Sequence, residues 1–178
     1  MSKIHIDIRI PYWPDKQLGM SYNHNMNSVN DWVCFLDHDV LILNPAWYDM
    51  CCDAINQLGH KAAFITAKCN GIAQGLQLCQ EAPQGHDILC HMRYAKQLAQ
   101  KYGSKPVLIE KKTGNQLSGF FFITHKEAWK KVGGFCHGFL GVDNDYHGRI
   151  EHHGYDAYVM PGLYMYHIYR TKAHWKMF

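Results

Sequence analysis

One apolar run interrupted by acids constrains the fold of this chain more than any other feature. Residues 32–36, WVCFL, carry no charged residue and show no alternation, which is typical of a strand that helices cover on both faces. Asp37, His38 and Asp39 follow directly, before a second apolar run at 40–43. Because a carboxylate is rarely buried without a partner, we expect a cation or hydrogen-bond donors opposite these two aspartates.

Strand and helix patterns alternate along the rest of the chain. Isoleucines at every second position of 4–10 predict a half-buried strand, and strand character recurs at 61–67, 106–110, 118–124, 157–160 and 163–169. Helical patterns occupy 19–28, 46–59, 87–102 and 125–134. This alternation predicts an α/β fold with a mostly parallel central sheet and helices on both faces. Ligands of such sheets gather at the carboxyl ends of the strands, where Asp37 and Asp39 lie.

Length, charge and cysteine usage limit the class of protein. The 178 residues suit a single domain spanning 1–178. The 18 basic and 15 acidic residues are mixed along the chain, which argues against a nucleic-acid partner. No apolar run approaches the ~20 residues of a membrane span, so we expect no transmembrane segment and a cytoplasmic location. The seven cysteines include no C-x-x-C pair and are expected to be reduced core thiols.

Asp37 and Asp39 form an acidic pair two residues apart, which suits binding of one divalent cation. Hard oxygen ligands favour Mg²⁺ or Mn²⁺, ions that commonly bind substrate phosphates alongside one or two carboxylates. The same spacing also occurs in turns, where Asp hydrogen-bonds to nearby backbone. Both interpretations remain open from the sequence.

Two further features could contribute to such a site. Asp143 and Asp145 follow a glycine-rich segment at the expected start of a helix, where an N-cap would explain one carboxylate and not the other. His167 stands in an aromatic strand, either as a satisfied core residue or as a metal ligand.

These segments, in this order, resemble the GT-A nucleotide-sugar glycosyltransferases, especially those of the family 2 type. The acidic strand DWVCFLDHDVLIL resembles the D-x-D strand of that family, and LGMSYNHNMN resembles the G-x-x-x-x-N segment before it. SGFFFITHKEAWKKVGGF, GVDNDYHGRIEHHGYDAYVMPG and YHIYR parallel its C-terminal half. The similarity covers most of residues 8–170.

The resemblance implies a GT-A (Rossmann-like) domain and an inverting, divalent-metal-dependent glycosyltransferase. The donor would be a nucleotide-diphosphate sugar, with UDP favoured over GDP, and the acceptor a hydroxyl of a glycan, lipid-linked or protein molecule. Asp143 would be the catalytic base, while Asp37, Asp39 and His167 would hold Mn²⁺ or Mg²⁺. Donor binding is implied for Pro11, Tyr12, Asn23, Asp37, His38, Asp39 and Arg170, and acceptor binding for Gly119 and Asp145.

The chain departs from the family pattern in two ways. Val142 stands where the family usually has Glu, and much of the usual N-terminal nucleotide-binding half is missing, so the chain resembles a minimal member of phage or viral type. Two other functions remain open. In a metal-dependent phosphoesterase, His147, His152 and His153 would join the acids in a two-metal site. The third possibility is a non-catalytic, sugar-binding remnant of the fold.

Overall fold

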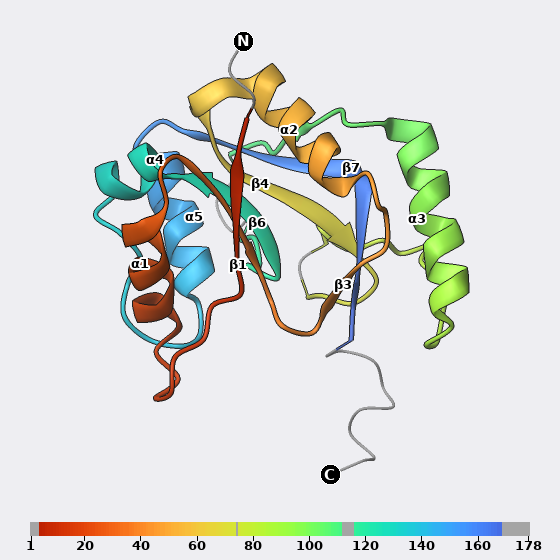
Figure 1. Cartoon of the computed structure of the whole chain (residues 1–178), viewed down its shortest axis with the longest axis horizontal. Coiled ribbons are helices and arrows are strands. Elements are labelled where there is room, and N and C mark those ends of the chain that lie inside the picture. The colour runs from red at the N-terminus through yellow and green to blue at the C-terminus, as the bar shows by residue number, and fades with distance from the viewer. Residues whose placement is uncertain (1–3, 74, 112–115, 169–178) are drawn as a thin grey trace.

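The computed structural model describes residues 4–73, 75–111 and 116–168, which form a seven-stranded sheet flanked by helices (Figure 1). The predicted α/β class is confirmed. The strands are β1 (Ile6–Arg9), β2 (Trp32–Leu36), β3 (Val40–Ile42), β4 (Ala62–Cys69), β5 (Val107–Leu108), β6 (Phe121–His125) and β7 (Asp156–His167). The helices are α1 (Leu18–Ser28), α2 (Trp47–Leu58), α3 (Ile88–Tyr102), α4 (Lys126–Lys131) and α5 (Val142–His152), with a 3₁₀ turn, η1 (Gly59–Lys61), after α2.

The sheet is mixed, so the expectation of a mostly parallel sheet is wrong. The strand order is β1-β2-β6-β4-β7-β3, with β5 paired to β7. Only β1–β2 and β4–β7 pair in parallel, whereas β2–β6, β4–β6, β3–β7 and β5–β7 are antiparallel. β6 lies between β2 and β4 and runs antiparallel to both, which makes the sheet mixed.

Helices cover both faces of the sheet, as predicted. The side chains of β2 alternate between two cores: Trp32, Cys34 and Leu36 pack in the cluster that contains α2, while Val33 and Phe35 pack in the cluster that contains α1, α4 and α5. A third cluster joins α3 to the tyrosines of β7. Figure 1 shows α1, α4 and α5 on one side of the sheet and α2 and α3 on the other. Burial on both faces explains why β2 reads as an unbroken apolar run.

The long helices end where local chemistry requires. The Asp87 carboxylate accepts hydrogen bonds from the N–H groups of Leu89 and Cys90 at 2.9 and 3.3 Å, which caps α3. Gly59 and Gly103 follow α2 and α3 with positive φ angles of 61° and 57°, a conformation that glycine adopts at no steric cost. Both helices therefore match their predicted ranges closely.

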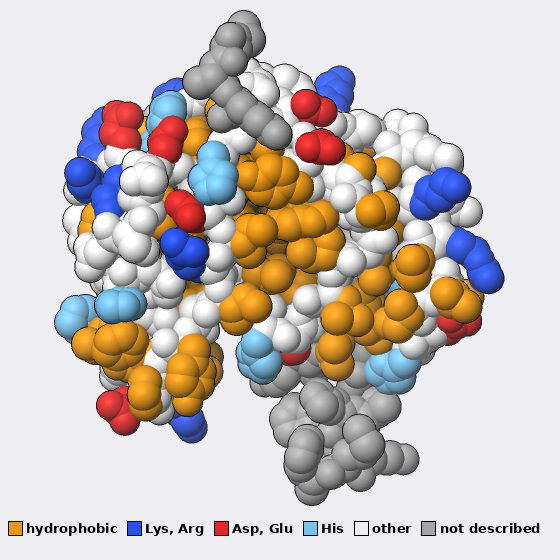
Figure 2. All heavy atoms as spheres, in the orientation of Figure 1, with side chains coloured by type: hydrophobic (Ala, Val, Ile, Leu, Met, Phe, Trp, Pro, Cys, Tyr) orange, Lys and Arg blue, Asp and Glu red, His pale blue; other side chains and the backbone are white. Residues whose placement is uncertain are grey.

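The first strand departs from its predicted burial. Ile6 is buried, but Ile8 and Ile10 are 43% and 56% exposed, because β1 is an edge strand and this part of it is left uncovered in the described residues. Figure 2 shows hydrophobic side chains gathered over the middle of the face on which β1 lies.

The last strand continues through Pro161 and Gly162. Its pairing with β4 shifts register between Ala67 and Lys68, and this bulge accommodates the proline, which cannot donate to the ladder. None of the helices in the described ranges is long and apolar enough to cross a bilayer.

Candidate functional site

The predicted metal ligands lie at one edge of the sheet. The strand pairings show that β2, β4 and β7 run in the same direction, whereas β3 and β6 run in the opposite one. The carboxyl ends of β2, β4 and β7 therefore lie at the same end of the sheet as the first residues of β3 and β6. Asp37 follows β2, and its N–H donates to the carbonyl of Phe120 at 2.9 Å. The turn 37–39 then leads directly into β3. The sequence shows this part of the chain as a second apolar run, but it was not predicted as a separate strand.

Asp37, Asp39 and His167 converge there. One ligand atom from each lies within 4.8 Å of the others, and Asp39 Oδ1 is 3.3 Å from His167 Nε2. Strand register causes this proximity: Val40 pairs with His167 across β3 and β7, and the Ile168 N–H donates to the Asp39 carbonyl at 3.0 Å. Two carboxylate oxygens and one imidazole nitrogen form a donor set that fits Mn²⁺ better than Mg²⁺, which prefers oxygen alone.

A second layer of contacts orients His167. Its Nδ1 lies 3.1 Å from the carbonyl of Gly71, and its backbone N–H donates to the side-chain oxygen of Asn70 at 2.7 Å. The ring also stacks on Phe120, with centroids 5.7 Å apart. A proton on Nδ1, donated to Gly71, would leave Nε2 as the ligating nitrogen on the side of Asp39, as at many metal-binding histidines.

The pKa values of Asp37 and Asp39 are shifted in opposite directions. Burial raises the pKa of Asp37 from 3.8 to about 6; the charges of Asp39 and Asp143 add to this, and His167 opposes it. Burial also acts to raise the pKa of Asp39, but the hydrogen bond and charge of His167 outweigh it and lower that pKa. Burial therefore disfavours the charged form of Asp37, and a cation between the ligands would stabilise that form.

Asp143 lies beside this cluster in the first turn of α5. Its Oδ2 accepts a hydrogen bond from the Gly119 N–H at 2.5 Å, one residue before the Phe120 carbonyl that binds Asp37. Burial raises the pKa of Asp143, while backbone N–H groups, chiefly that of Gly119, oppose the rise. Asp143 is consequently a stronger base than an exposed Asp.

Gly119 is required by the closeness of its neighbours. A Cβ atom at this position would lie 2.9 Å from the Cβ of Asp143 and 3.1 Å from the hydroxyl of Tyr22. The Tyr22 hydroxyl is buried and has no hydrogen-bond partner within the described ranges. Burial raises its pKa well above 10, with further contributions from Asp37 and Asp143. Tyr22 thus belongs to the same site.

Three residues of this site were not predicted from the sequence: Tyr22, Asn70 and Gln77. Gln77 is fully buried and accepts from the Ser118 N–H at 2.8 Å while donating to the Ser118 carbonyl at 2.9 Å. This pair of bonds fixes the backbone just before Gly119. The Asn-Gly dipeptide at 70–71 after a strand was the available signal for Asn70, because it marks a turn at the ligand-binding edge.

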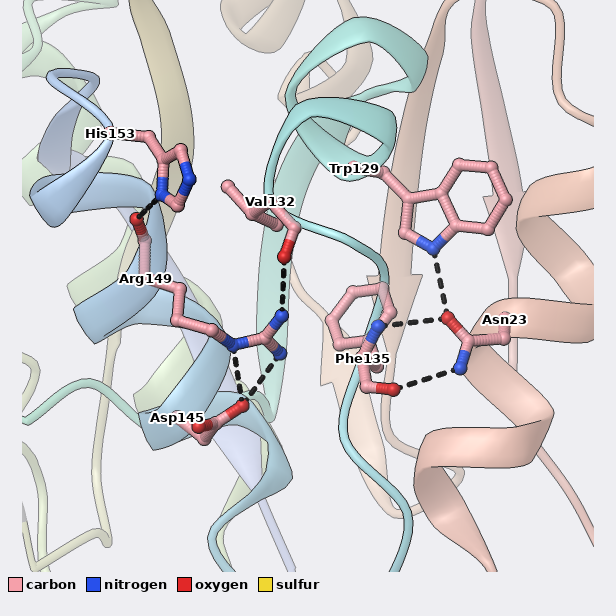
Figure 3. Close-up of polar contacts among 7 residues, drawn as sticks. All are labelled: Asn23, Trp129, Val132, Phe135, Asp145, Arg149 and His153. Atoms are coloured by element: carbon pink, nitrogen blue, oxygen red, sulfur yellow. Dashed lines mark hydrogen bonds and ion pairs between the residues drawn. The ribbon is translucent and has the colours of Figure 1, made fainter.

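Asn23 and Asp145 have partners elsewhere (Figure 3). The Asn23 side-chain oxygen accepts from Trp129 Nε1 at 2.9 Å and from the Phe135 N–H at 2.8 Å, and its nitrogen donates to the Phe135 carbonyl. Asp145 forms an ion pair with Arg149 at 2.6 Å, one turn along α5. Asn23 joins α1 to the segment after α4, and its role in nucleotide binding stays a prediction, as does acceptor binding by Asp145.

The other predicted donor contacts lie on the surface or outside the described residues. Tyr12 is 80% exposed, and its carbonyl accepts from the Ser21 hydroxyl at 3.0 Å. Pro11 precedes it and is partly buried, and His38 is exposed between the two acids. Arg170 lies outside the described residues.

The histidines of the phosphoesterase alternative do not join the acids. His147 is buried on α5, 3.6 Å from Glu151, while His152 and His153 are exposed at the C-terminal end of that helix. Within ranges 4–73, 75–111 and 116–168, no group of potential metal ligands contains any of the three.

Comparison of the sequence with models of known protein families gives no match, and comparison with curated proteins gives no significant match. The functional assignment therefore rests on the site itself and on the motifs that led to it.

Proposed function

We propose that this chain is an inverting, divalent-metal-dependent glycosyltransferase with a small GT-A type domain. The observation that carries the proposal is the convergence of Asp37, Asp39 and His167 within 4.8 Å, with Asp143 hydrogen-bonded to Gly119 beside them. Asp143 and His167 are far in sequence from Asp37 and Asp39, and all four were expected from the sequence to act at one site. A cluster formed by chance would not also bring the candidate base to the same edge of the sheet.

The residues present fit a manganese ion. Asp37, Asp39 and His167 would hold it, with Asn70 and Gly71 fixing the imidazole. When bound, the ion supplies positive charge to the diphosphate of a nucleotide-sugar donor as the glycosidic bond breaks. The exposed ring of Tyr12 offers a surface on which the nucleotide base could stack.

Asp143 would take the proton from the acceptor hydroxyl as that oxygen attacks the anomeric carbon. Burial raises the pKa of this carboxyl, and general-base efficiency increases as the pKa approaches the working pH. The Gly119 N–H fixes one carboxylate oxygen and leaves the other for the acceptor. A single displacement of this kind inverts the anomeric configuration. The acceptor hydroxyl would approach the carboxylate of Asp143, which the Gly119 N–H holds in place.

Transfer is better supported than hydrolysis by two metal ions. A two-metal site needs more ligands than the two aspartates and one histidine that converge here, and the extra histidines of that alternative lie elsewhere on α5. The single cluster favours a one-metal mechanism.

A nucleotide panel tests the proposal. The melting temperature of the purified chain would be measured with UDP, GDP, ADP and CMP, each with and without Mn²⁺. A nucleotide present at 100 times its Kd stabilises by about 2.7 kcal/mol, which corresponds to roughly 5–10 °C for a chain of this size. We expect UDP or GDP with Mn²⁺ to give this shift.

The variants Asp39→Ala and Asp15→Ala serve as the test and its control, because Asp15 is exposed and lies outside the cluster. We expect the shift to be lost in Asp39→Ala and kept in Asp15→Ala. The proposal fails if no nucleotide stabilises the wild type in a way that depends on both Mn²⁺ and Asp39.

A further inference from the structure

A second group of potential ligands lies at the opposite end of β2. Asp31 precedes this strand and Asp37 follows it, so the two groups are about 20 Å apart at 3.3 Å per residue. Asp31, His60 and His125 each place one ligand atom within 4.8 Å of the others. They come from three segments: the residue before β2, the turn η1 and the end of β6. Nothing in the proposed glycosyl transfer uses them.

Backbone and ring contacts hold these segments together. Trp32 pairs with His125 across β2 and β6, and the Lys126 N–H donates to the Asp31 carbonyl at 2.8 Å. The imidazole of His60 lies 4.7 Å from that of His125 between centroids, and its Nε2 is 2.8 Å from Asp31 Oδ1. The side chains of Asp31 and His60 are about half exposed, at 50% and 48%, so solutes can reach them.

His125 is buried completely, yet one of its nitrogens is unsatisfied. Nδ1 accepts a hydrogen bond from the Ala128 N–H at 3.2 Å and caps α4. Nε2 is buried and has no partner in full hydrogen-bond geometry among the described residues, although the backbone of His60 is close enough to oppose the lowering of this imidazole's pKa by burial. A buried polar atom without a partner costs free energy and calls for an explanation such as an ion that binds there. Since Nδ1 accepts from Ala128, Nε2 carries the proton of the neutral ring and is the nitrogen that an ion could bind once that proton leaves.

We propose that Asp31, His60 and His125 form a binding site for Zn²⁺, separate from the Asp37, Asp39 and His167 cluster. Two imidazole nitrogens and one carboxylate oxygen are ligands that zinc accepts, and three protein ligands leave a fourth position for water. The imidazoles select against Mg²⁺ and Ca²⁺. Ligand atoms around tetrahedral zinc are about 3.3 Å apart, so small side-chain movements would close the present arrangement. The ion would tie β2, β6 and the turn η1 together.

Loading this site has a cost at α4. With Nδ1 accepting from Ala128, the proton of neutral His125 sits on Nε2 and must leave that nitrogen when zinc binds. If it moves to Nδ1, the cap on Ala128 is lost, which reduces affinity by roughly a factor of five to ten. Structural zinc sites bind tightly enough to bear such a loss.

Calorimetric titration of zinc chloride into the full chain tests the proposal. The Asp39→Asn variant serves as the background, because it weakens the other cluster. We expect one equivalent of Zn²⁺ to bind and to raise the melting temperature, while Mn²⁺ at equal concentration does neither. Adding His60→Ala should lower zinc affinity at least tenfold while the zinc-free protein still unfolds in a single cooperative transition, since this side chain is half exposed. Adding His153→Ala, an exposed histidine outside the group, should leave affinity unchanged.

A second variant tests whether a loss of zinc binding could result from misfolding. His125→Asn keeps a side-chain oxygen to cap Ala128 and removes the imidazole, so it should lose zinc binding while α4 is retained in the circular dichroism spectrum. Zinc affinity in His60→Ala equal to that of the background would overturn the proposal, as would a tenfold loss in His153→Ala, which would indicate binding to surface histidines. Neither result bears on nucleotide binding, so the two proposals can fail separately.

Discussion

Replacing Asp37 by Asn should stabilise the metal-free protein, although it removes a proposed metal ligand. The pKa of Asp37 is raised from 3.8 to about 6 in the folded chain, so folding opposes its ionisation at neutral pH. The two pKa values differ by about 2 pH units, and each unit corresponds to about 1.36 kcal/mol. Ionisation of Asp37 therefore lowers the free energy of unfolding at neutral pH by at most about 3 kcal/mol. Because the side chain is partly exposed, we expect about 2 kcal/mol, or roughly 4–8 °C in melting temperature at pH 7.

The pH dependence of this effect has a defined sign. Below about pH 3, well under the unfolded-state pKa of 3.8, Asp37 is protonated in both states, and the two proteins should be equally stable. Between pH 4 and 6 the folded wild type holds a proton that the unfolded chain releases, so its stability relative to Asp37→Asn falls as pH rises. Above pH 6 the full difference is present. Urea denaturation in EDTA at pH 4, 5, 6 and 7 measures this directly.

With Mn²⁺ present, wild type should become more stable than Asp37→Asn. Wild-type protein gains stability with Mn²⁺, whereas Asp37→Asn gains less, because one ligand is neutral. Asp15→Asn, at an exposed position, is the matched control and should change neither quantity. A variant Asp37→Asn that is no more stable than wild type at pH 7 in EDTA would refute the inference that folding opposes the ionisation of Asp37.

Four further predictions follow from the contacts. Asp143→Asn should abolish sugar transfer while Mn²⁺-dependent nucleotide binding, measured calorimetrically, stays within about twofold; turnover equal to wild type would remove Asp143 from the mechanism. Asn70→Ala should lower Mn²⁺ affinity roughly 10–100-fold by releasing His167, and an unchanged Kd would contradict this role. Burial lowers the pKa of His147 from 6.5 to about 4. The free energy of unfolding of wild type relative to His147→Gln should therefore fall by up to about 1.4 kcal/mol per pH unit as pH falls from 6.5 to 4. A difference between the two proteins that stays constant with pH in urea denaturation would contradict this. Gly162→Ala would place a Cβ 2.1 Å from the Gly103 carbonyl oxygen and should cost at least about 2 kcal/mol, whereas Gly148→Ala, with open space around it, should be neutral or stabilising in thermal melts.

The two acids and the histidine of the cluster could be predicted from the sequence because they are polar residues next to or within apolar segments. A charge directly after an apolar strand, or an imidazole inside an aromatic one, is visible without coordinates, and these positions were Asp37, Asp39 and His167. The helix 88–102 could likewise be read from its period, its Asp87 cap and its terminal Gly103. In each case the signal lies within a few neighbouring residues.

Contacts that depend on strand direction and register could not be read in this way. Alternating strands and helices suggested a parallel sheet, yet β6 pairs antiparallel with both β2 and β4. Asn70 reaches His167 only through the pairing of β4 with β7, and Gln77 reaches Ser118 across 41 positions. Asn23 shows the reverse case: it lies in a segment that resembles a nucleotide-binding motif, and its amide is used to hold Phe135 and Trp129.

The position of β7 has a consequence for biogenesis. β7 lies between β4 and β3, so a growing chain on the ribosome leaves the edges of both strands unpaired until β7 emerges. His167 arrives with that strand and completes the cluster. The proposed metal site therefore lacks its imidazole until β7 has joined the sheet, and a chain that lacks β7 presents unpaired strand edges.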